Sequence, residues 1–124
     1  MLAARYKFSP RTVAGVFIRA LRSKKNGYSV LVLPKETTGS KMAVVLTSAV
    51  ATTAVRRHAI KRAIYQNLAQ WVKTGAPDIL AADGINFYLI VLVVNWKLAE
   101  PQLRTQDWKE TVEYLLNTKK NLHS

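Results

Sequence analysis

The sequence contains no cysteine, only two histidines and only seven acidic residues among 124. The absence of cysteine excludes disulfides, thiolate metal sites and cysteine nucleophiles. The few histidines and carboxylates argue against a metal-dependent or acid–base hydrolase, because such enzymes cluster these groups. A Gly-rich phosphate-binding loop is also missing, since the five glycines are scattered along the chain.

Long hydrophobic runs are absent as well. The longest, residues 87–94, is far shorter than the ~20 residues that a membrane-spanning helix needs, and it is typical of a buried strand. Residues 1–7 are too polar for a signal peptide. We therefore expect a cytoplasmic protein without a membrane attachment.

Positive charge is what the sequence has in excess, with a formal net charge of +12. Residues 1–77 hold fourteen Lys and Arg against the single acid Glu36, a net charge of +13, whereas residues 78–124 carry a net charge of −1. Solubility alone requires only ~2–8 net charges on a small domain. The excess therefore predicts a polyanionic partner, most simply a nucleic acid. An anionic membrane is less favoured, because no segment is clearly a basic amphipathic membrane helix.

Hydrophobic periodicity and turn residues predict one α+β domain over residues 1–124, with the element order α-β-β-α-β-α and helices packed on a small sheet. We expect helices over 10–22, 54–72 and about 107–118, and strands over 28–33, 41–48 and 85–95. The first two strands are predicted to form a hairpin. Thr52 or Thr53 is expected to cap the second helix, Asp107 with Glu110 to start the last, and residues 119–124 to fray.

The first half of the second predicted helix carries a basic stripe that ends in an aromatic residue. Its members are Arg56, Arg57, His58, Lys61, Arg62 and Tyr65. Positive side chains at a helix N-terminus are unfavourable in an isolated protein, because the helix dipole is positive there. They become favourable when free backbone N–H groups and Arg side chains converge on phosphates. A purely solvated face is the alternative, although such faces usually mix both signs.

The stretch from Ala54 to Arg62 resembles the signature of the bacterial ribonuclease P protein. That signature is an Ala-Val pair, then Arg-Asn-Arg, an aliphatic residue and Lys-Arg. This chain differs at His58 and Ala59, where the family has Asn and Arg. It also differs upstream, where the family has a pair of lysines in place of Ala49-Val50 and Gly-Asn in place of Thr52-Thr53. The matching positions are Ser48, Ala54, Val55, Arg57, Ile60, Lys61 and Arg62. The order and spacing of the predicted elements agree along almost the whole chain.

The resemblance implies a two-layer fold like a ribosomal-protein domain, with an unusual left-handed crossover. It implies an accessory, monomeric subunit of ribonuclease P, in which the RNA is the catalyst and holds Mg²⁺. No catalytic residue, metal or cofactor is then expected in the protein itself. The basic stripe would dock on the ribonuclease P RNA. A cleft would guide the 5′ leader of precursor tRNA, with Val13, Phe17, Tyr28 and Leu31 as candidate lining residues.

Two other functional classes remain open at this point. One is a non-catalytic RNA-binding or ribosome-associated module on the same fold, and the other is a DNA-binding domain, although no helix-turn-helix pair is recognisable. Cleavage by the protein itself would need clustered carboxylates. Asp78, Asp83, Glu100 and Asp107 look instead like loop and cap residues.

The aromatic residues divide into core and surface candidates. Trp71 and Trp108 fall on apolar helical faces and are predicted to be core. Trp96 follows the last strand next to Lys97 and is the one tryptophan to test for contact with RNA. Phe17 fits a leader cleft and the core equally well.

Overall fold

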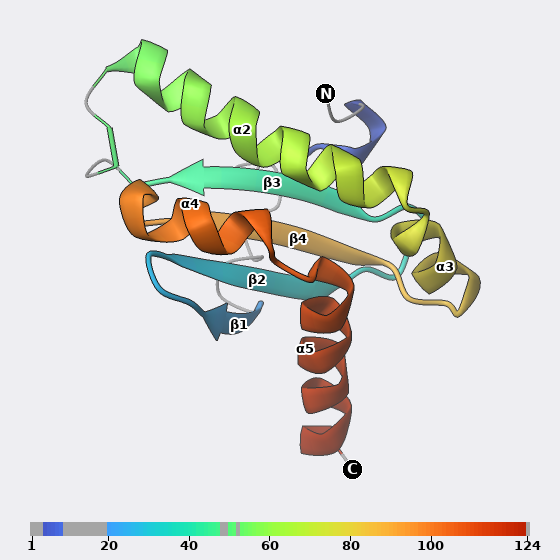
Figure 1. Cartoon of the computed structure of the whole chain (residues 1–124). Coiled ribbons are helices and arrows are strands. Elements are labelled where there is room, and N and C mark those ends of the chain that lie inside the picture. The colour runs from blue at the N-terminus through green and yellow to red at the C-terminus, as the bar shows by residue number, and fades with distance from the viewer. Residues whose placement is uncertain (1–3, 9–19, 48–49, 52, 124) are drawn as a thin grey trace.

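The computed structural model describes residues 4–8, 20–47, 50–51 and 53–123, with side chains described up to residue 117 (Figure 1). It is an α+β fold with a small sheet packed by helices, which confirms the predicted fold class. The elements are η1 (Ala4–Tyr6), β1 (Leu21–Lys24), β2 (Tyr28–Pro34), β3 (Lys41–Leu46), α2 (Ala54–Lys73), α3 (Ala76–Ala82), β4 (Phe87–Val93), α4 (Trp96–Arg104) and α5 (Trp108–His123).

The four strands form one sheet in the order β1-β2-β4-β3. β2 is antiparallel to both β1 and β4, whereas β3 is parallel to β4. The predicted hairpin between residues 28–33 and 41–48 is therefore wrong, because β4 lies between the two strands. Most of β4 is buried on both faces, and such a strand belongs inside a sheet, where both of its edges are paired.

A crossover connection joins the parallel strands β3 and β4. It consists of the 20-residue helix α2 and the shorter α3, on the face of the sheet that bears the helices. With the helices toward the viewer and both strands pointing up, β4 lies to the left of β3, so the crossover is left-handed (Figure 1). About 98% of parallel crossovers are right-handed. The rare hand is therefore a distinctive feature, and it agrees with the resemblance drawn from the sequence.

Alternation along the strands divides the core into two clusters. The larger cluster lies between the sheet and the helices, and Trp71 and Trp108 belong to it, as predicted. The smaller cluster lies on the opposite face and consists of Leu31, Leu33, Ala43 and Ile90. Phe8 and Ala20 pack against it from outside the sheet.

Three further expectations differ from the structure. Residues 21–24 form β1 rather than the end of a helix over 10–22, whose residues 9–19 lie outside the described part of the chain. The sequence pattern predicts no helix at α3 or α4, because both are short and contain a proline. α5 continues to His123, so residues 119–123 are helical rather than a frayed tail. Within the described residues, no helix is long and apolar enough to cross a bilayer.

The β1–β2 turn packs tightly against the start of α4. Gly27 has a φ angle of +89°, and its carbonyl oxygen accepts hydrogen bonds from the N–H groups of Val94 and Asn95, both at 2.9 Å. A Cβ atom at Gly27 would lie 2.7 Å from the Asn95 carbonyl oxygen and 2.8 Å from Leu98 Cβ. Both the backbone conformation and the close approach therefore require glycine.

Replacing Gly27 with alanine should lower the free energy of unfolding by roughly 3 kcal/mol, the sum of left-handed backbone strain and a steric clash. Gly39→Ala is the matched control, since Gly39 has a φ angle of +99° and no atom within 4 Å of an added Cβ. It should lose only the strain, about 1–2 kcal/mol. Urea denaturation measures both values, and equal losses would contradict the close approach at Gly27.

Candidate nucleic-acid interface

Helix α2 has one apolar side and no acidic residue anywhere along its length. It starts at the N-cap Thr53, whose side chain accepts a hydrogen bond of 3.3 Å from the Arg56 N–H. The inner side packs on the sheet through Ile60, Ile64, Leu68 and Trp71, all of them buried. The opposite side exposes Arg56 and Arg62, with Lys61 half-buried, and no carboxylate on the helix neutralises these cations.

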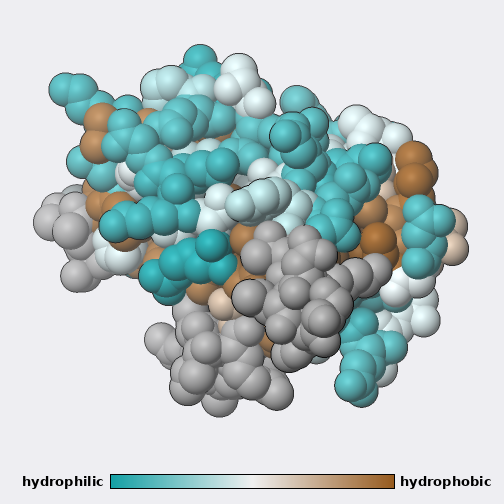
Figure 2. Space-filling view, turned by 90° about the horizontal axis from the view of Figure 1, so that it is seen from below, coloured by the Kyte–Doolittle hydropathy of each residue, from teal (hydrophilic) through white to brown (hydrophobic). Residues whose placement is uncertain are grey.

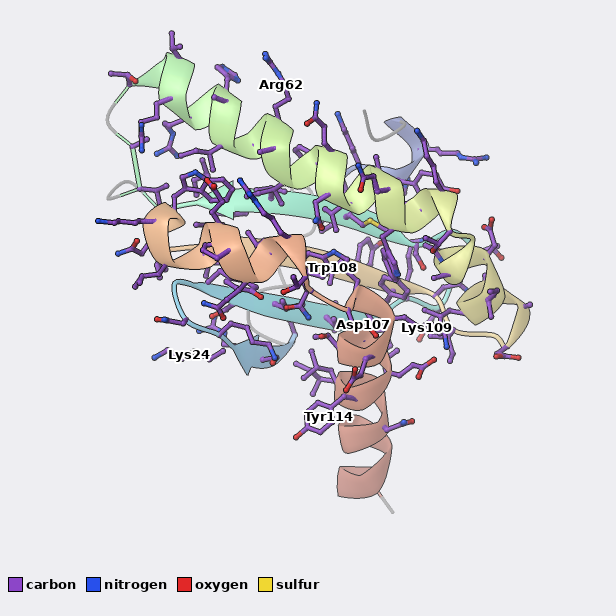
Figure 3. All side chains as sticks on the ribbon, viewed as in Figure 1. Lys24, Arg62, Asp107, Trp108, Lys109 and Tyr114 are labelled. Carbon is purple, nitrogen blue, oxygen red and sulfur yellow. The ribbon has the colours of Figure 1, made fainter. Side chains whose placement is uncertain are left out.

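A groove about 300 Å³ in volume runs along this exposed side, and we call it the α2 groove. Its lining residues are Lys7, His58, Lys61, Arg62, Tyr65 and Gln66. The five from α2 are spaced i, i+3, i+4, i+7 and i+8, which places them on one face. Four of the six predicted RNA-binding residues thus come together, and Arg62 among them points away from the sheet (Figure 3).

Tyr65 and Lys7 join the groove to the free edge of β3. The Tyr65 hydroxyl accepts a hydrogen bond of 3.2 Å from the Val44 N–H, so that the ring is fixed against the sheet. The Lys7 Nζ lies 4.8 Å from the centroid of that ring, a cation–π distance. Lys7 itself is positioned by a parallel bridge to Met42 of β3.

Sequence reasoning missed Lys7 and Gln66 as members of the groove. Lys7 lies 47 residues before the first residue of α2, and the pairing with β3 brings it there. The general excess of cations in residues 1–77 was the only signal that pointed to it. Gln66 could have been found, because it lies four residues after Arg62 and eight after His58 on the same face.

Arg57 has a different environment from the other cations of the stripe. Its guanidinium donates hydrogen bonds to three backbone carbonyl oxygens, those of Leu46 at 3.0 Å and of Thr47 and Ala51 at 3.3 Å. These carbonyls belong to the end of β3 and the connection that leads to α2. Arg57 therefore ties that connection together, whereas Arg56 is exposed at the helix start.

Arg57→Ala should lower the free energy of unfolding by about 1–3 kcal/mol, because three hydrogen bonds from a half-exposed charged group are lost. Arg62→Ala, at an exposed position of the same helix, should change it by less than about 0.5 kcal/mol. Urea denaturation distinguishes the two variants. An Arg57→Ala protein as stable as the Arg62→Ala protein would show that the carbonyl contacts contribute nothing.

The structure does not bring together Tyr28 and Leu31, the two leader-cleft candidates among the described residues. Val13 and Phe17 lie outside the described residues. Tyr28 and Leu31 are each only 1% exposed, and they point to opposite faces of β2, because residues three apart on a strand alternate. As a pair they cannot line one cleft, which corrects the expectation for these two residues.

Two tyrosines have phenol groups that are harder to ionise than usual. Burial raises the pKa of Tyr28, whose hydroxyl donates a hydrogen bond to the side-chain oxygen of Gln106. Burial also raises the pKa of Tyr65, and the Val44 hydrogen bond opposes this only in part. Both groups therefore remain neutral in the folded protein beyond the pH at which they ionise in the unfolded chain.

Stability should consequently fall as the pH rises above about 10, the pKa of an unperturbed tyrosine. Above that pH the unfolded chain loses tyrosine protons that the folded protein still holds. The contribution of the neutral tyrosines to stability is therefore complete below about pH 10 and is lost as the pH rises through the pKa of the folded state. Urea midpoints between about pH 9 and 11 should decline less steeply for Tyr28→Phe than for the unchanged protein. Parallel declines would contradict the raised pKa of Tyr28.

Among the described residues, no group of three or more His, Asp or Glu side chains could hold a metal ion. Glu100 pairs with Arg104 at 2.8 Å, and Glu113 pairs with Lys109 at 3.1 Å. Asp107 accepts a hydrogen bond of 3.0 Å from the Glu110 N–H at the start of α5. These groups thus have local structural roles.

A second cleft, about 700 Å³ in volume, lies between the β1–β2 turn and the start of α5. Lys25 lines it together with Asp107 and Glu110, so its charge is mixed. Seen from this end of the molecule, the described surface is mostly hydrophilic, with hydrophobic residues in small separate areas (Figure 2). Of these two cavities, the α2 groove is the one with cations and no carboxylate in its lining, so it suits a polyanion better.

Trp96 is the first residue of α4 and lies beside α2. It is half-buried, packs against the larger core cluster and lines a narrow gap with Ala63 and Asn67. The Asn67 amide connects the same elements, because it donates to the Leu103 carbonyl at 2.9 Å and accepts from the Trp108 indole at 2.7 Å. Trp96 is thus placed beside the exposed side of α2 rather than in the α2 groove.

Comparison with known proteins identifies the fold. No protein-family model matches the sequence, and no curated protein sequence matches it either. The structure is similar to that of the RNase P protein of Staphylococcus aureus, with a TM-score of 0.60 and 16% sequence identity. The similarity covers 93% of this chain and 95% of that chain. The chain therefore has the fold of an RNase P protein along nearly its whole length.

Proposed function

We propose that this protein is the protein subunit of a ribonuclease P and takes part in the 5′ maturation of tRNA. One observation carries the proposal: the chain shares its fold with an RNase P protein over 93% of its length, and the motif that resembles the family signature lies on helix α2 of that fold. Fold similarity by itself does not define an activity. The uncompensated positive charge of α2 supplies the second argument, because it fits an RNA partner.

In this proposal the protein docks on the catalytic RNA through α2. His58, Lys61 and Arg62 contact phosphates from the α2 groove, and Arg56 adds a further cation at the helix start. Arg57 contributes indirectly, because it holds the connection between β3 and α2. Cleavage is the task of the RNA and of the Mg²⁺ ions that it binds, and the protein is an accessory subunit.

The proposal also includes binding of the precursor-tRNA leader. Phe17, with Val13, is the candidate contact, because aromatic rings stack on single-stranded bases. Phe17→Ala should weaken leader-dependent binding of the substrate more than docking on the RNA subunit. A variant that merely unfolds would identify Phe17 as a core residue.

The decisive measurement is cleavage of a precursor tRNA by the cognate ribonuclease P RNA at limiting Mg²⁺, with and without the protein. The protein should stimulate cleavage strongly. Reversing Arg56, Lys61 and Arg62 to Glu should abolish the stimulation and flatten the salt dependence of RNA binding, since each phosphate contact adds about 0.7–0.9 to the slope. Arg57 is left unchanged, because its reversal would damage the fold.

A matched control reverses three cations elsewhere, Lys73, Arg104 and Lys109, for the same change in net charge. This control should retain most of the stimulation if the position of the charge matters, and lose as much as the α2 variant if only the total charge does. An absence of stimulation with RNA binding retained would favour a non-catalytic RNA-binding or ribosome-associated module. RNA that co-purifies with the protein then identifies the partner, and preferential binding of duplex DNA would indicate a DNA-binding protein.

A further inference from the structure

The α2 groove is lined by an aromatic ring as well as by cations, whereas attraction to phosphates alone would require only the cations. We propose that the groove binds one unpaired nucleotide of the partner RNA. Its base stacks on the Tyr65 ring, and its phosphate contacts Lys7, Lys61 and Arg62. This inference rests on the proposed function and adds to it the kind of RNA element that the groove recognises.

The Tyr65 ring is held ready for stacking. Its hydroxyl accepts a hydrogen bond from the Val44 N–H at the free edge of β3, so the polar end of the side chain is already bound to the sheet. The ring is half-buried and borders the groove. Because the side chain is fixed before the ligand arrives, little conformational entropy is lost on binding. A fixed aromatic face of this kind typically receives bases of single-stranded nucleic acid.

The Lys7 side chain covers the face of the Tyr65 ring on which we place the base. Its ammonium group lies over the ring at 4.8 Å from the centroid, where a stacked base would lie. The backbone of this segment is fixed, because Phe8 donates a 3.2 Å hydrogen bond to the Met42 carbonyl. Only the flexible Lys7 side chain has to move, and it moves from the ring to the nearby phosphate.

An unpaired nucleotide fits this groove better than a duplex does. In a duplex, neighbouring bases cover both faces of each base, so that no face is left for the Tyr65 ring. The volume of about 300 Å³ lies at the lower limit of ligand-binding sites, which suits a single base. Gln66 adds an amide with both donors and acceptors, which is the chemistry that a base edge requires.

The test compares two labelled probes of equal charge: a uridine octamer and an abasic octamer with the same ribose-phosphate backbone. The unchanged protein should bind the uridine octamer about 5- to 100-fold more tightly, the range expected for one stacked base. Tyr65→Phe retains the ring and should keep most of this preference, whereas Tyr65→Leu should bind the two probes alike. Equal binding by the unchanged protein, or a full preference in Tyr65→Leu, would overturn the proposal.

A second measurement avoids dependence on a destabilised variant. A 4-thiouridine octamer is photo-crosslinked to the unchanged protein, and the modified peptide is identified by mass spectrometry. Crosslinks should fall on the peptide that contains Tyr65 or on the one that contains Lys7. Crosslinks found only elsewhere would refute the nucleotide site.

The outcomes separate this inference from the proposed function. A protein that stimulates ribonuclease P cleavage but binds both octamers equally leaves the proposed function intact and removes the nucleotide site. A protein that prefers the uridine octamer through Tyr65 but does not stimulate cleavage keeps the nucleotide site and removes the ribonuclease P assignment.

Discussion

The parallel pairing of β3 with β4 obliges the chain to return along the sheet between these strands, and α2 is the segment that makes the return. A helix in that position must bury one side, and Ile60, Ile64 and Leu68 provide it. The other side necessarily faces solvent. The left-handed crossover determines which edge of the sheet lies beside that exposed side, and it is the free edge of β3 (Figure 1). The α2 groove is a consequence of this geometry, because Lys7 and Tyr65 both attach to that edge.

The same geometry gives the cations of α2 two different surroundings. Arg57 lies on the side of the helix that faces the end of β3, where its planar guanidinium satisfies carbonyl groups of an irregular connection. Arg62, five residues later, points away from the sheet (Figure 3). A sequence motif cannot show this division, because both residues are arginines within one basic run. The resemblance to the family signature therefore identifies the segment, while the structure assigns individual roles within it.

The sequence predicted those features that depend on local pattern. The span of α2, the Thr53 cap, the buried Trp71 and Trp108 and the three longer strands all follow from periodicity and turn residues. It did not predict the strand order. β4 lies between β2 and β3 because it is apolar on both faces, whereas the prediction paired strands that are neighbours in the chain. β1 was missed since Leu21 also fits helical spacing, and α4 since Pro101 lies inside it. Four groove residues were predicted as one helical face and Gln66 was predictable in the same way, whereas Lys7 required a tertiary contact.

Without a bound polyanion, the positive charges of this protein repel one another. Residues 1–77 carry thirteen net positive charges, and the ion pairs of the described residues in α4 and α5 neutralise cations of the C-terminal part instead. The cations of α2 also lie at the positive end of its dipole, so the isolated protein bears unfavourable interactions that no nearby carboxylate relieves. A polyanion relieves them only in the folded state, where the cations share one face. Binding and folding are therefore thermodynamically linked, and occupation of the α2 groove stabilises the same β3–α2 arrangement that creates it.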